Sequence, residues 1–589
     1  MSEKKIASIV AADVGSILTH VCLIDRVEGI YRLVARAEVP TSLGCPEDDV
    51  TVGLRRAVER LEQIAQRRFL DQEGGFITPQ KDAGEGVDAF VATASAASPL
   101  KCAVIGLTND LSIESAQHAC RGSNATVSHI VTLGARPRRW RGEIVTALRE
   151  QPPEVIVMVG GLDRGPTAPL EQAARVLTNI FENFEEEKRP ILVFAGNQEA
   201  RRPVADRVST QFDLRVVDNV RPSVETESLV ELQRELAGIY AHIKLARLPG
   251  YRRLREWSET PVVSTADALS RIFRFMARRN ALSQGVLGVD VGGASTYVGA
   301  AQGEKYQWTL AGALGTSHNA DGLSQGMFLE DIARWLPVPM EAAEVVSRLE
   351  NGWLRPRSVP QTLEDLYLCH AVARQNLLAA MWRMRRQHWA PLDGGQWRTT
   401  PPFDLIAVRG GCLTHTPKDG LVMLSLLDAL QPTGLARLAV DWASVWPQLG
   451  ALATSVPLAA TQVLERDAFR ELGTIIAPIG RARDGEHALQ IKVIEEDGQV
   501  TEWDLPAGVI RCIPLSLDEE ATIEVRPSHR FDIGLGRAGV GGRTHVRGGE
   551  LGIIVDTRGR PLVLPQDAQR CRAKLQEWLG SFADDADSP

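Results

Sequence analysis

The sequence predicts an α/β protein built from two similar halves, with an α/β insertion in the first half and a β-rich C-terminal region. Three observations carry this prediction: an internal repeat, an alternation of short buried strands with helices between the two copies, and a run of strands after about residue 485. The length of 589 residues, with 44% hydrophobic and 24% charged residues, is that of an ordinary globular chain of several domains.

The internal repeat pairs residues 12–21 with residues 289–298 without a gap. Asp13 aligns with Asp290 and Thr19 with Thr296, both at an offset of 277 positions. Each copy follows an apolar run and leads into another β-rich run, as two strands joined by a tight glycine-containing hairpin would. A duplicated unit of this kind predicts two lobes of similar fold.

Between the two copies, short buried strands alternate with helices, which is typical of parallel βαβ units. The expected strands are 103–106, 155–159, 191–195 and 214–217. Residues 170–187 are expected to form a helix, because their apolar positions recur at helical spacing. We therefore expect 1–88 to be the first half of lobe I, 89–222 an inserted Rossmann-like domain and 223–284 a helical connection.

After the second hairpin, residues 362–389 predict a long helix that opens with a capping box, Thr362-Leu-Glu-Asp365. Residues 404–408 predict a buried strand that ends in Arg409-Gly410-Gly411. We expect 285–484 to form lobe II. Residues 485–589 should form a β-rich C-terminal domain, followed by an acidic tail at the end of the chain.

The two hairpins share the pattern Asp-x-Gly followed by Ser or Gly. Glycine lets backbone N–H groups approach a phosphate closely, and a carboxylate at the end of the preceding strand can hold the waters of a Mg²⁺ ion. One such hairpin is usually only a turn, because Asp and Gly are common turn residues. Two hairpins in register, followed by a strand that ends in Gly-Gly, predict a phosphate site formed by both lobes.

This order of two phosphate hairpins and a Gly-Gly turn resembles the actin, Hsp70 and sugar kinase superfamily. The resemblance implies a two-lobed actin/Hsp70-like (ribonuclease H-like) nucleotide-binding fold that closes on ATP and Mg²⁺. Asp13 and Asp290 would then be the catalytic and metal-binding carboxylates. The residues implied to contact the nucleotide are Gly15, Ser16, Thr19, Gly292, Gly293, Ser295, Thr296, Gly410 and Gly411.

Longer segments resemble one branch of this superfamily, the glutamate mutase L family. These segments are 92–101, 103–107, 157–163, 194–197, 290–296, 426–432 and 551–561. The resemblance covers nearly the whole chain. It implies an ATP-binding, chaperone-like reactivating factor for an adenosylcobalamin-dependent carbon-skeleton mutase of the glutamate mutase type, in which the nucleotide state switches lobe closure.

The mismatch-repair protein of similar name belongs to a different type of ATPase. Residues 532–536 spell the Asp-x-Gly-x-Gly of that fold, which also needs an upstream helix carrying Glu-x-x-x-Asn. No Asn occurs after Asn376, so we interpret 532–536 as a glycine-rich loop of the β-rich tail.

The chain departs from the family pattern in both hairpins. Tyr297 stands where the family has a terminal Asp, Ser295 replaces a Thr, and Ile17 stands at another usual Thr. Losing a carboxylate near the phosphates weakens metal or water positioning, so the residues predict ATP binding and leave ATPase activity open. Two alternatives remain: a small-molecule kinase of the same superfamily, with Asp163 as its base, and a nucleotide-binding pseudo-ATPase scaffold.

Charge and composition argue against several other classes. Lys and Arg number 66 against 74 Asp and Glu, a net charge of −8, so no global positive field attracts nucleic acid or an anionic membrane. No signal peptide and no apolar run of about 20 residues occurs, and the eight cysteines are scattered, so we expect a cytoplasmic protein. No histidine has the Asp-x-His-x-x-Gly context of a base-off corrinoid site, so we expect a partner of a mutase.

Overall fold

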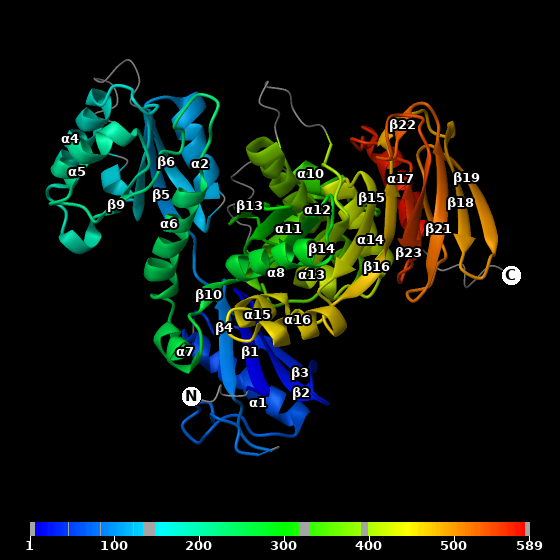
Figure 1. Cartoon of the computed structure of the whole chain (residues 1–589), viewed down its shortest axis with the longest axis horizontal. Coiled ribbons are helices and arrows are strands. Elements are labelled where there is room, and N and C mark those ends of the chain that lie inside the picture. The colour runs from blue at the N-terminus through cyan, green and yellow to red at the C-terminus, as the bar shows by residue number, and fades with distance from the viewer. Residues whose placement is uncertain are drawn as a thin grey trace. The chain divides into compact units, whose positions relative to one another are not determined.

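The computed structural model describes residues 6–44, 46–82, 84–121, 123–132, 146, 148–312, 314–317, 329–389 and 399–582 (Figure 1). The chain divides into two compact units: unit 1 contains Met1–Ala96 and Pro249–Pro589, and unit 2 contains Ala97–Leu248. The inserted unit therefore differs at both ends from the expected 89–222. No helix of the described residues is long and apolar enough to cross a membrane.

Lobe I of unit 1 is built on a sheet of five strands in the order β3-β2-β1-β4-β10. Its strands are β1 (Ser8–Val14), β2 (Leu18–Val27), β3 (Ile30–Pro40), β4 (Ala89–Ala94) and β10 (Val263–Ser264). β1 is antiparallel to β2 and parallel to β4. The helix α1 (Val50–Ala65) begins after Asp49, whose side chain accepts a hydrogen bond from the Thr51 N–H.

Lobe II is built on an eight-stranded sheet in the order β13-β12-β11-β14-β15-β16-β24-β20. Its strands are β11 (Val286–Val291), β12 (Thr296–Gln302), β13 (Lys305–Ala311), β14 (Leu405–Arg409), β15 (Gly434–Val440), β16 (Arg470–Ala477), β20 (Ile510–Ile513) and β24 (Ile553–Asp556). Here β11 is antiparallel to β12 and parallel to β14. The first five strands thus repeat the order of lobe I, which confirms the two-lobed actin/Hsp70-like fold.

Helices cover both faces of these sheets. They are α7 (Tyr251–Trp257), α8 (Thr265–Arg279), α10 (Leu329–Ala333), α11 (Ala342–Leu354), α12 (Leu363–Met384), α13 (Gly411–Thr414), α14 (Asp419–Leu430), α15 (Trp446–Leu452), α16 (Pro457–Arg466) and α17 (Ala568–Gly580). Figure 1 shows α8 in green beside α15 in yellow. The expected capping box is present, because Thr362 and Asp365 bond each other's backbone N–H at the start of α12.

One hydrophobic core is shared by both lobes. It joins Ile9 and Ala11 of β1 with Ala407 of β14, and α8 and α15 supply further buried side chains such as Phe273 and Trp446. Side chains alternate along a strand, so Asp13 points to the same face of its sheet as Ile9 and Ala11. Both lobes therefore direct the ends of their central strands toward one buried region.

The C-terminal residues add a four-stranded sheet, β19-β18-β21-β23, and a pair, β17-β22. These strands are β17 (Ile479–Gly480), β18 (His487–Glu495), β19 (Val500–Pro506), β21 (Glu520–Pro527), β22 (Phe531–Asp532) and β23 (Gly542–Arg547). The expected strand-rich C-terminal region is present, but two of its strands, β20 and β24, belong to the lobe II sheet. The expected acidic tail lies outside the described residues.

Unit 2 contains a parallel sheet in the order β6-β5-β7-β8-β9. Its strands are β5 (Leu100–Gly106), β6 (Ala125–Thr132), β7 (Val155–Met158), β8 (Ile191–Phe194) and β9 (Leu214–Val216). Its helices include α2 (Glu114–Arg121), α4 (Ala168–Phe181), α5 (Arg201–Val208) and α6 (Val230–Tyr240). The expected βαβ alternation is therefore observed, whereas β4 pairs with lobe I.

Candidate functional site

The tips of the two repeated hairpins lie against each other. Each tip is closed by a backbone hydrogen bond, from Gly15 N–H to Leu18 over 3.0 Å and from Gly292 N–H to Ser295 over 2.9 Å. A Cβ atom on Gly293 would clash with the Ile17 side chain and would lie 3.6 Å from Ser16 Oγ. The fold thus brings together two glycine turns that are far apart in the sequence. The other hairpin is so close to residue 293 that only glycine, which has no Cβ, fits there.

Several backbone N–H groups at these tips remain available. Among the described residues, no hydrogen bond uses the N–H of Ser16, Gly293 or Ala294. Successive free amides in tight turns form concave sites that suit anions such as phosphate. The tips can therefore bind an anionic group without any charged side chain of their own.

The two predicted threonines brace the hairpins instead of facing a ligand. Thr19 is fully buried, and its Oγ1 lies 2.9 Å from Thr41 Oγ1. Thr296 is also fully buried and donates from Oγ1 to the Leu314 carbonyl oxygen over 2.6 Å. Both hydroxyls therefore fix the loop that follows the third strand of their lobe.

Asp13, at the end of β1, accepts three side-chain hydrogen bonds. Its Oδ1 accepts from Thr93 Oγ1 over 2.7 Å and from Thr265 Oγ1 over 2.8 Å. Its Oδ2 accepts from Arg409 Nη2 over 2.6 Å. With the residue only 2% exposed, both carboxylate oxygens are used inside the protein.

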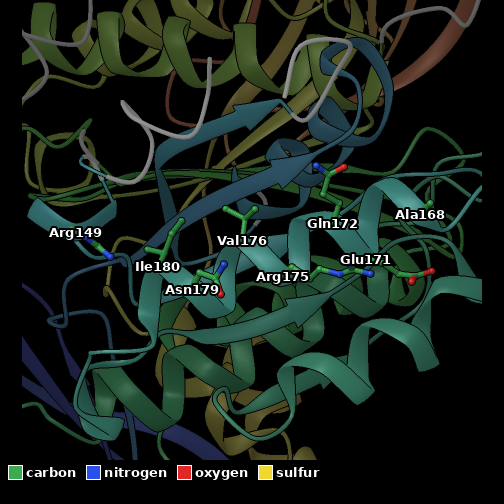
Figure 2. Close-up of a pocket in the computed structure, with 8 residues that line it drawn as sticks. All are labelled: Arg149, Ala168, Glu171, Gln172, Arg175, Val176, Asn179 and Ile180. Carbon is green, nitrogen blue, oxygen red and sulfur yellow. The ribbon is translucent and has the colours of Figure 1, made fainter. Parts of the chain in front are cut away.

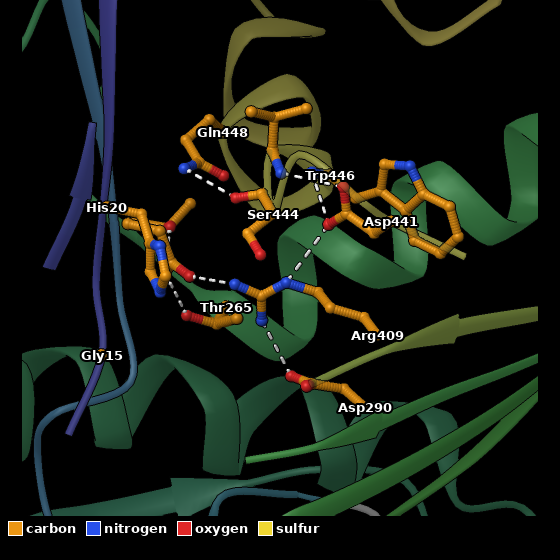
Figure 3. Close-up of polar contacts among 12 residues, drawn as sticks. Gly15, His20, Thr265, Asp290, Arg409, Asp441, Ser444, Trp446 and Gln448 are labelled. Atoms are coloured by element: carbon orange, nitrogen blue, oxygen red, sulfur yellow. Dashed lines mark hydrogen bonds and ion pairs between the residues drawn. The ribbon is translucent and has the colours of Figure 1, made fainter. Parts of the chain in front are cut away.

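Arg409, the last residue of β14, joins the two lobes. Its Nη1 donates to Asp290 Oδ2 over 3.0 Å, and its Nε lies 3.3 Å from Asp441 Oδ2, as Figure 3 shows. Together with the Asp13 contact, one guanidinium bridges three carboxylates. In the strand register Arg409 opposes Asp290 as Thr93 opposes Asp13, so the repeat places a charge in lobe II where lobe I has a hydroxyl.

The electrostatics of this inter-lobe cluster follow from burial and from the one guanidinium. Burial lowers the pKa of Arg409, but the charges of Asp290, Asp13 and Asp441 outweigh it and raise that pKa. Burial raises the pKa of Asp441 to about 6, against the opposing effect of Arg409. Burial likewise raises the pKa of Asp290, whose Oδ1 accepts no hydrogen bond from the described residues.

A Mg²⁺ ion held jointly by Asp13 and Asp290 does not fit these side chains. Both Asp13 oxygens and one Asp290 oxygen already accept hydrogen bonds, and the Arg409 guanidinium lies between the two carboxylates. Within the described parts of the chain, no group of three or more His, Cys, Asp or Glu side chains could hold a metal ion. The cation that these carboxylates contact is part of the protein.

The Gly-Gly turn lies beside the second hairpin strand. Gly410 has a φ of +125°, and a Cβ there would clash with the Val291 carbonyl, so this position requires glycine. Gly411 begins the short helix α13. The turn therefore lies near one tip, and its contact with adenosine remains a prediction.

Tyr297 contributes no polar group to the tips. It opposes Asp290 in the register of β11 and β12, is 2% exposed, and lies in the shared core with its ring 5.6 Å from Trp308. Burial raises its pKa, and its hydroxyl pairs with that of Tyr306. The residue at the family's Asp position is thus a core side chain.

Asp163, the base of the kinase alternative, belongs to unit 2. Its Oδ1 accepts from the Gln198 N–H over 3.0 Å and from Asn219 Nδ2 over 2.9 Å. The carboxylate thus holds together the turns that follow β7, β8 and β9. This arrangement explains Asp163 without a catalytic role.

Unit 2 also contains a cavity of about 580 Å³ along one side of α4, which Figure 2 shows. It is lined by Arg149, Ala168, Glu171, Gln172, Arg175, Val176, Asn179 and Ile180. No residue of the predicted site lines it. The cavity is therefore unrelated in composition to the hairpin site.

No sequence motif marks Thr93, Thr265, Arg409 or Asp441 as site residues. A signal for Arg409 was present, since an arginine at the end of a buried strand must find a carboxylate. Its partners could not be chosen in advance, because Asp13 is 396 positions away. The two threonine hydroxyls carried no such signal.

The repeated sheets and the paired hairpins define a two-lobed α/β protein of the actin, Hsp70 and sugar kinase type. The chain belongs to the MutL protein family, whose model matches residues 9–468. It is similar to Protein MutL of Clostridium tetanomorphum, with 24% identity over 491 residues that cover 77% of this chain and 97% of that protein.

Similarity to solved structures is low in sequence and in superposition. The nucleotide-free structure of acetone carboxylase gives a TM-score of 0.32 at 11% identity, covering 85% of this chain and 81% of that one. A nucleotide-free diol dehydratase-reactivating factor gives a TM-score of 0.31 at 10% identity, covering 76% and 99%.

Proposed function

We propose that this protein is an ATP-binding accessory factor that reactivates an adenosylcobalamin-dependent carbon-skeleton mutase of the glutamate mutase type. The observation that carries nucleotide binding is the meeting of two glycine hairpins, one from each lobe, with free amides at Ser16, Gly293 and Ala294. Membership of the MutL protein family supports the mutase partner.

The hairpin tips would bind the phosphates through these amides, and Gly410-Gly411 would face the adenosine. The Ile17 side chain lies against Gly293, so phosphates between the tips must move Ile17 aside. Since these residues belong to different lobes, this movement would change how the lobes close. The protein would then use ATP as a switch that controls docking on the mutase.

Nucleotide binding, rather than turnover, is the core of the proposal. Asp13 and Asp290 are both paired with Arg409, and of their four carboxylate oxygens only Asp290 Oδ1 has no hydrogen-bond partner among the described residues. Tyr297 and Asp163 are held by other contacts. The geometry therefore gives no specific support to the kinase alternative, while binding without turnover would fit both a switch and a pseudo-ATPase scaffold.

Isothermal titration calorimetry with ATP tests nucleotide binding directly. We expect the wild type to bind, and Gly293→Ala to weaken binding about tenfold, because the new methyl group crowds Ile17 at the tips. Gly352→Ala is the matched control, since a Cβ at Gly352 in α11 meets nothing within 4 Å. Absence of binding, or equal affinities of both variants, would contradict the proposed site.

A reactivation assay tests the partner. An adenosylcobalamin-dependent mutase of the glutamate mutase type would be inactivated by turnover and then incubated with this protein, fresh cofactor and ATP. We expect activity to return only when both the protein and ATP are present. Recovery that is the same without ATP, or none with it, would contradict the accessory role and leave the binding result standing.

A further inference from the structure

The position between the two hairpin carboxylates, where a bound cation would be expected, is filled by Arg409. We propose that Arg409 is a built-in cation that takes the place of a divalent metal, so that the protein binds ATP and ADP as tightly without Mg²⁺ as with it. This inference rests on the proposed function, because it concerns the same nucleotide site.

The geometry of the guanidinium fits this role. Each of its three nitrogens faces a different carboxylate: Nη2 faces Asp13 at 2.6 Å, Nη1 faces Asp290 at 3.0 Å and Nε faces Asp441 at 3.3 Å. Arginine keeps its charge at all physiological pH values and presents its donors in a rigid plane. One side chain therefore pairs with carboxylates from both lobes at once and offsets one of their negative charges.

The cluster is held in place from outside. Asp441 is fully buried, and its carboxylate accepts from the backbone N–H groups of Val445 over 2.9 Å and Trp446 over 3.1 Å. Asp13 is fixed by its two threonine hydroxyls. Arg409 is only 8% exposed. The guanidinium thus occupies a preformed site made by two lobes, and this is not the arrangement of a mobile surface side chain.

The location of the cluster links it to the phosphates. Asp13 and Asp290 each precede their hairpin glycine by two positions, so their charge lies directly behind the tips. Unneutralised carboxylates so close to the hairpin tips would repel a triphosphate bound there. Arg409 permanently reduces that repulsion, and it occupies the position between Asp13 and Asp290 that a metal ion would need. The site should therefore accept free nucleotide.

The test compares ATP affinity with Mg²⁺ and with EDTA, using the wild-type protein and calorimetry. We expect the two dissociation constants to agree within about threefold. If binding is at least about thirtyfold weaker with EDTA, this inference is wrong and the proposed function survives. If no binding occurs in either buffer, both the proposed function and this inference are overturned.

Substitution of Arg409 adds a second readout. Arg409→Lys keeps the charge, but one ammonium group cannot reach three carboxylates. We expect it to bind ATP about tenfold more weakly with EDTA and to recover when Mg²⁺ is added. The control is Arg437→Lys in β15, where the native arginine pairs with Glu471 at 3.1 Å. Arg409→Lys that folds and binds like the control in both buffers would overturn the inference.

Discussion

Two buried ion clusters in unit 1 use the same residue types in different proportions. The inter-lobe cluster holds one arginine, Arg409, among three aspartates. A second cluster, near the C-terminus, holds three arginines and two aspartates. Its members are Arg374 of α12, Asp428 of α14, Asp556 of β24, and Arg558 and Arg560 just after β24.

Every side chain of the C-terminal cluster has an oppositely charged partner within the cluster. Arg558 bridges Asp428 at 2.6 Å and Asp556 at 2.8 Å, and Arg560 reaches Asp556 at 2.7 Å, with all five side chains at most 2% exposed. Arg560 also donates to the Pro432 carbonyl over 3.0 Å. These contacts join segments 426–432 and 551–561, two of the segments that carry the family resemblance.

The comparison separates a structural cluster from a site. The C-terminal cluster lies wholly within the buried interior of lobe II, where its charged side chains contact only other protein groups. The inter-lobe cluster has an excess of carboxylates, an unpaired Asp290 Oδ1, and two glycine turns beside it. The C-terminal cluster also has a carboxylate oxygen, Asp428 Oδ2, without a hydrogen-bond partner among the described residues, so the features that distinguish the inter-lobe cluster are its excess of carboxylates and its position beside two glycine turns.

Breaking the C-terminal cluster should have the largest effect on stability. Asp556→Asn leaves Arg558 and Arg560 without their shared carboxylate, which should lower the free energy of unfolding by about 3–5 kcal/mol in urea denaturation. Glu520→Gln is the control, because it breaks a surface pair with Arg547 and should cost less than about 1 kcal/mol. Similar losses for both variants would contradict a structural role for the cluster.

Acid should weaken the same region through His370 of α12. His370 is fully buried, with ring nitrogens 2.8 Å from Ser425 Oγ and from Thr416 Oγ1. Burial, and then the charge of Arg374, lower its pKa to about 3 from 6.5. The unfolded chain takes up a proton below pH 6.5 and the folded chain does not, so stability falls as the pH drops.

The expected loss is about 1.4 kcal/mol per pH unit, or about 2 kcal/mol between pH 6.5 and pH 5. Urea denaturation across this range measures the slope. His370→Gln retains an uncharged hydrogen-bonding side chain and should flatten it. An unchanged slope in this variant would show that another group is responsible.

Removing a single buried hydroxyl should have a smaller effect, and it should separate residues that affect only stability from those that also affect ATP binding. Thr265→Val removes one hydroxyl from Asp13 and should cost about 1.5 kcal/mol in unfolding free energy, because the acceptor is charged. It should also weaken ATP binding. Thr433→Val removes a buried hydroxyl that bonds the Thr400 carbonyl at 2.9 Å, and should destabilise the protein without affecting ATP. Equal effects on ATP would contradict the assignment of Thr265 to the site.

Much of the fold could be predicted because it is encoded locally or by repetition. The repeat at residues 12–21 and 289–298 anticipated two sheets with one strand order. The sequence placed the start of the insertion at residue 89 instead of at Ala97, because β4 reads as a buried strand of either sheet and only its pairing with β1 assigns it to lobe I. Likewise, all four strands of the C-terminal sheet lie between β16 and its partner β24 in the sequence, so no local pattern predicts this pairing.

For the site, the two glycine turns could be predicted from the sequence, but the pairing of Arg409 with the carboxylates beside them could not. Glycine spacing identified both hairpins, which the fold brings together. The hydroxyls of Thr19 and Thr296 matched the pattern but point into the loops. The contact of Arg409 with Asp13 depends on how two lobes pack, and no local pattern records it.

Amide hydrogen exchange with and without ATP tests the central claim most directly, since it reports on both clusters in one experiment. We predict that ATP slows exchange by at least about tenfold in residues 14–19 and 291–296, and leaves residues 553–561 unchanged. Equal protection of all three segments, or protection confined to 553–561, would contradict the assignment of the hairpin tips as the nucleotide site.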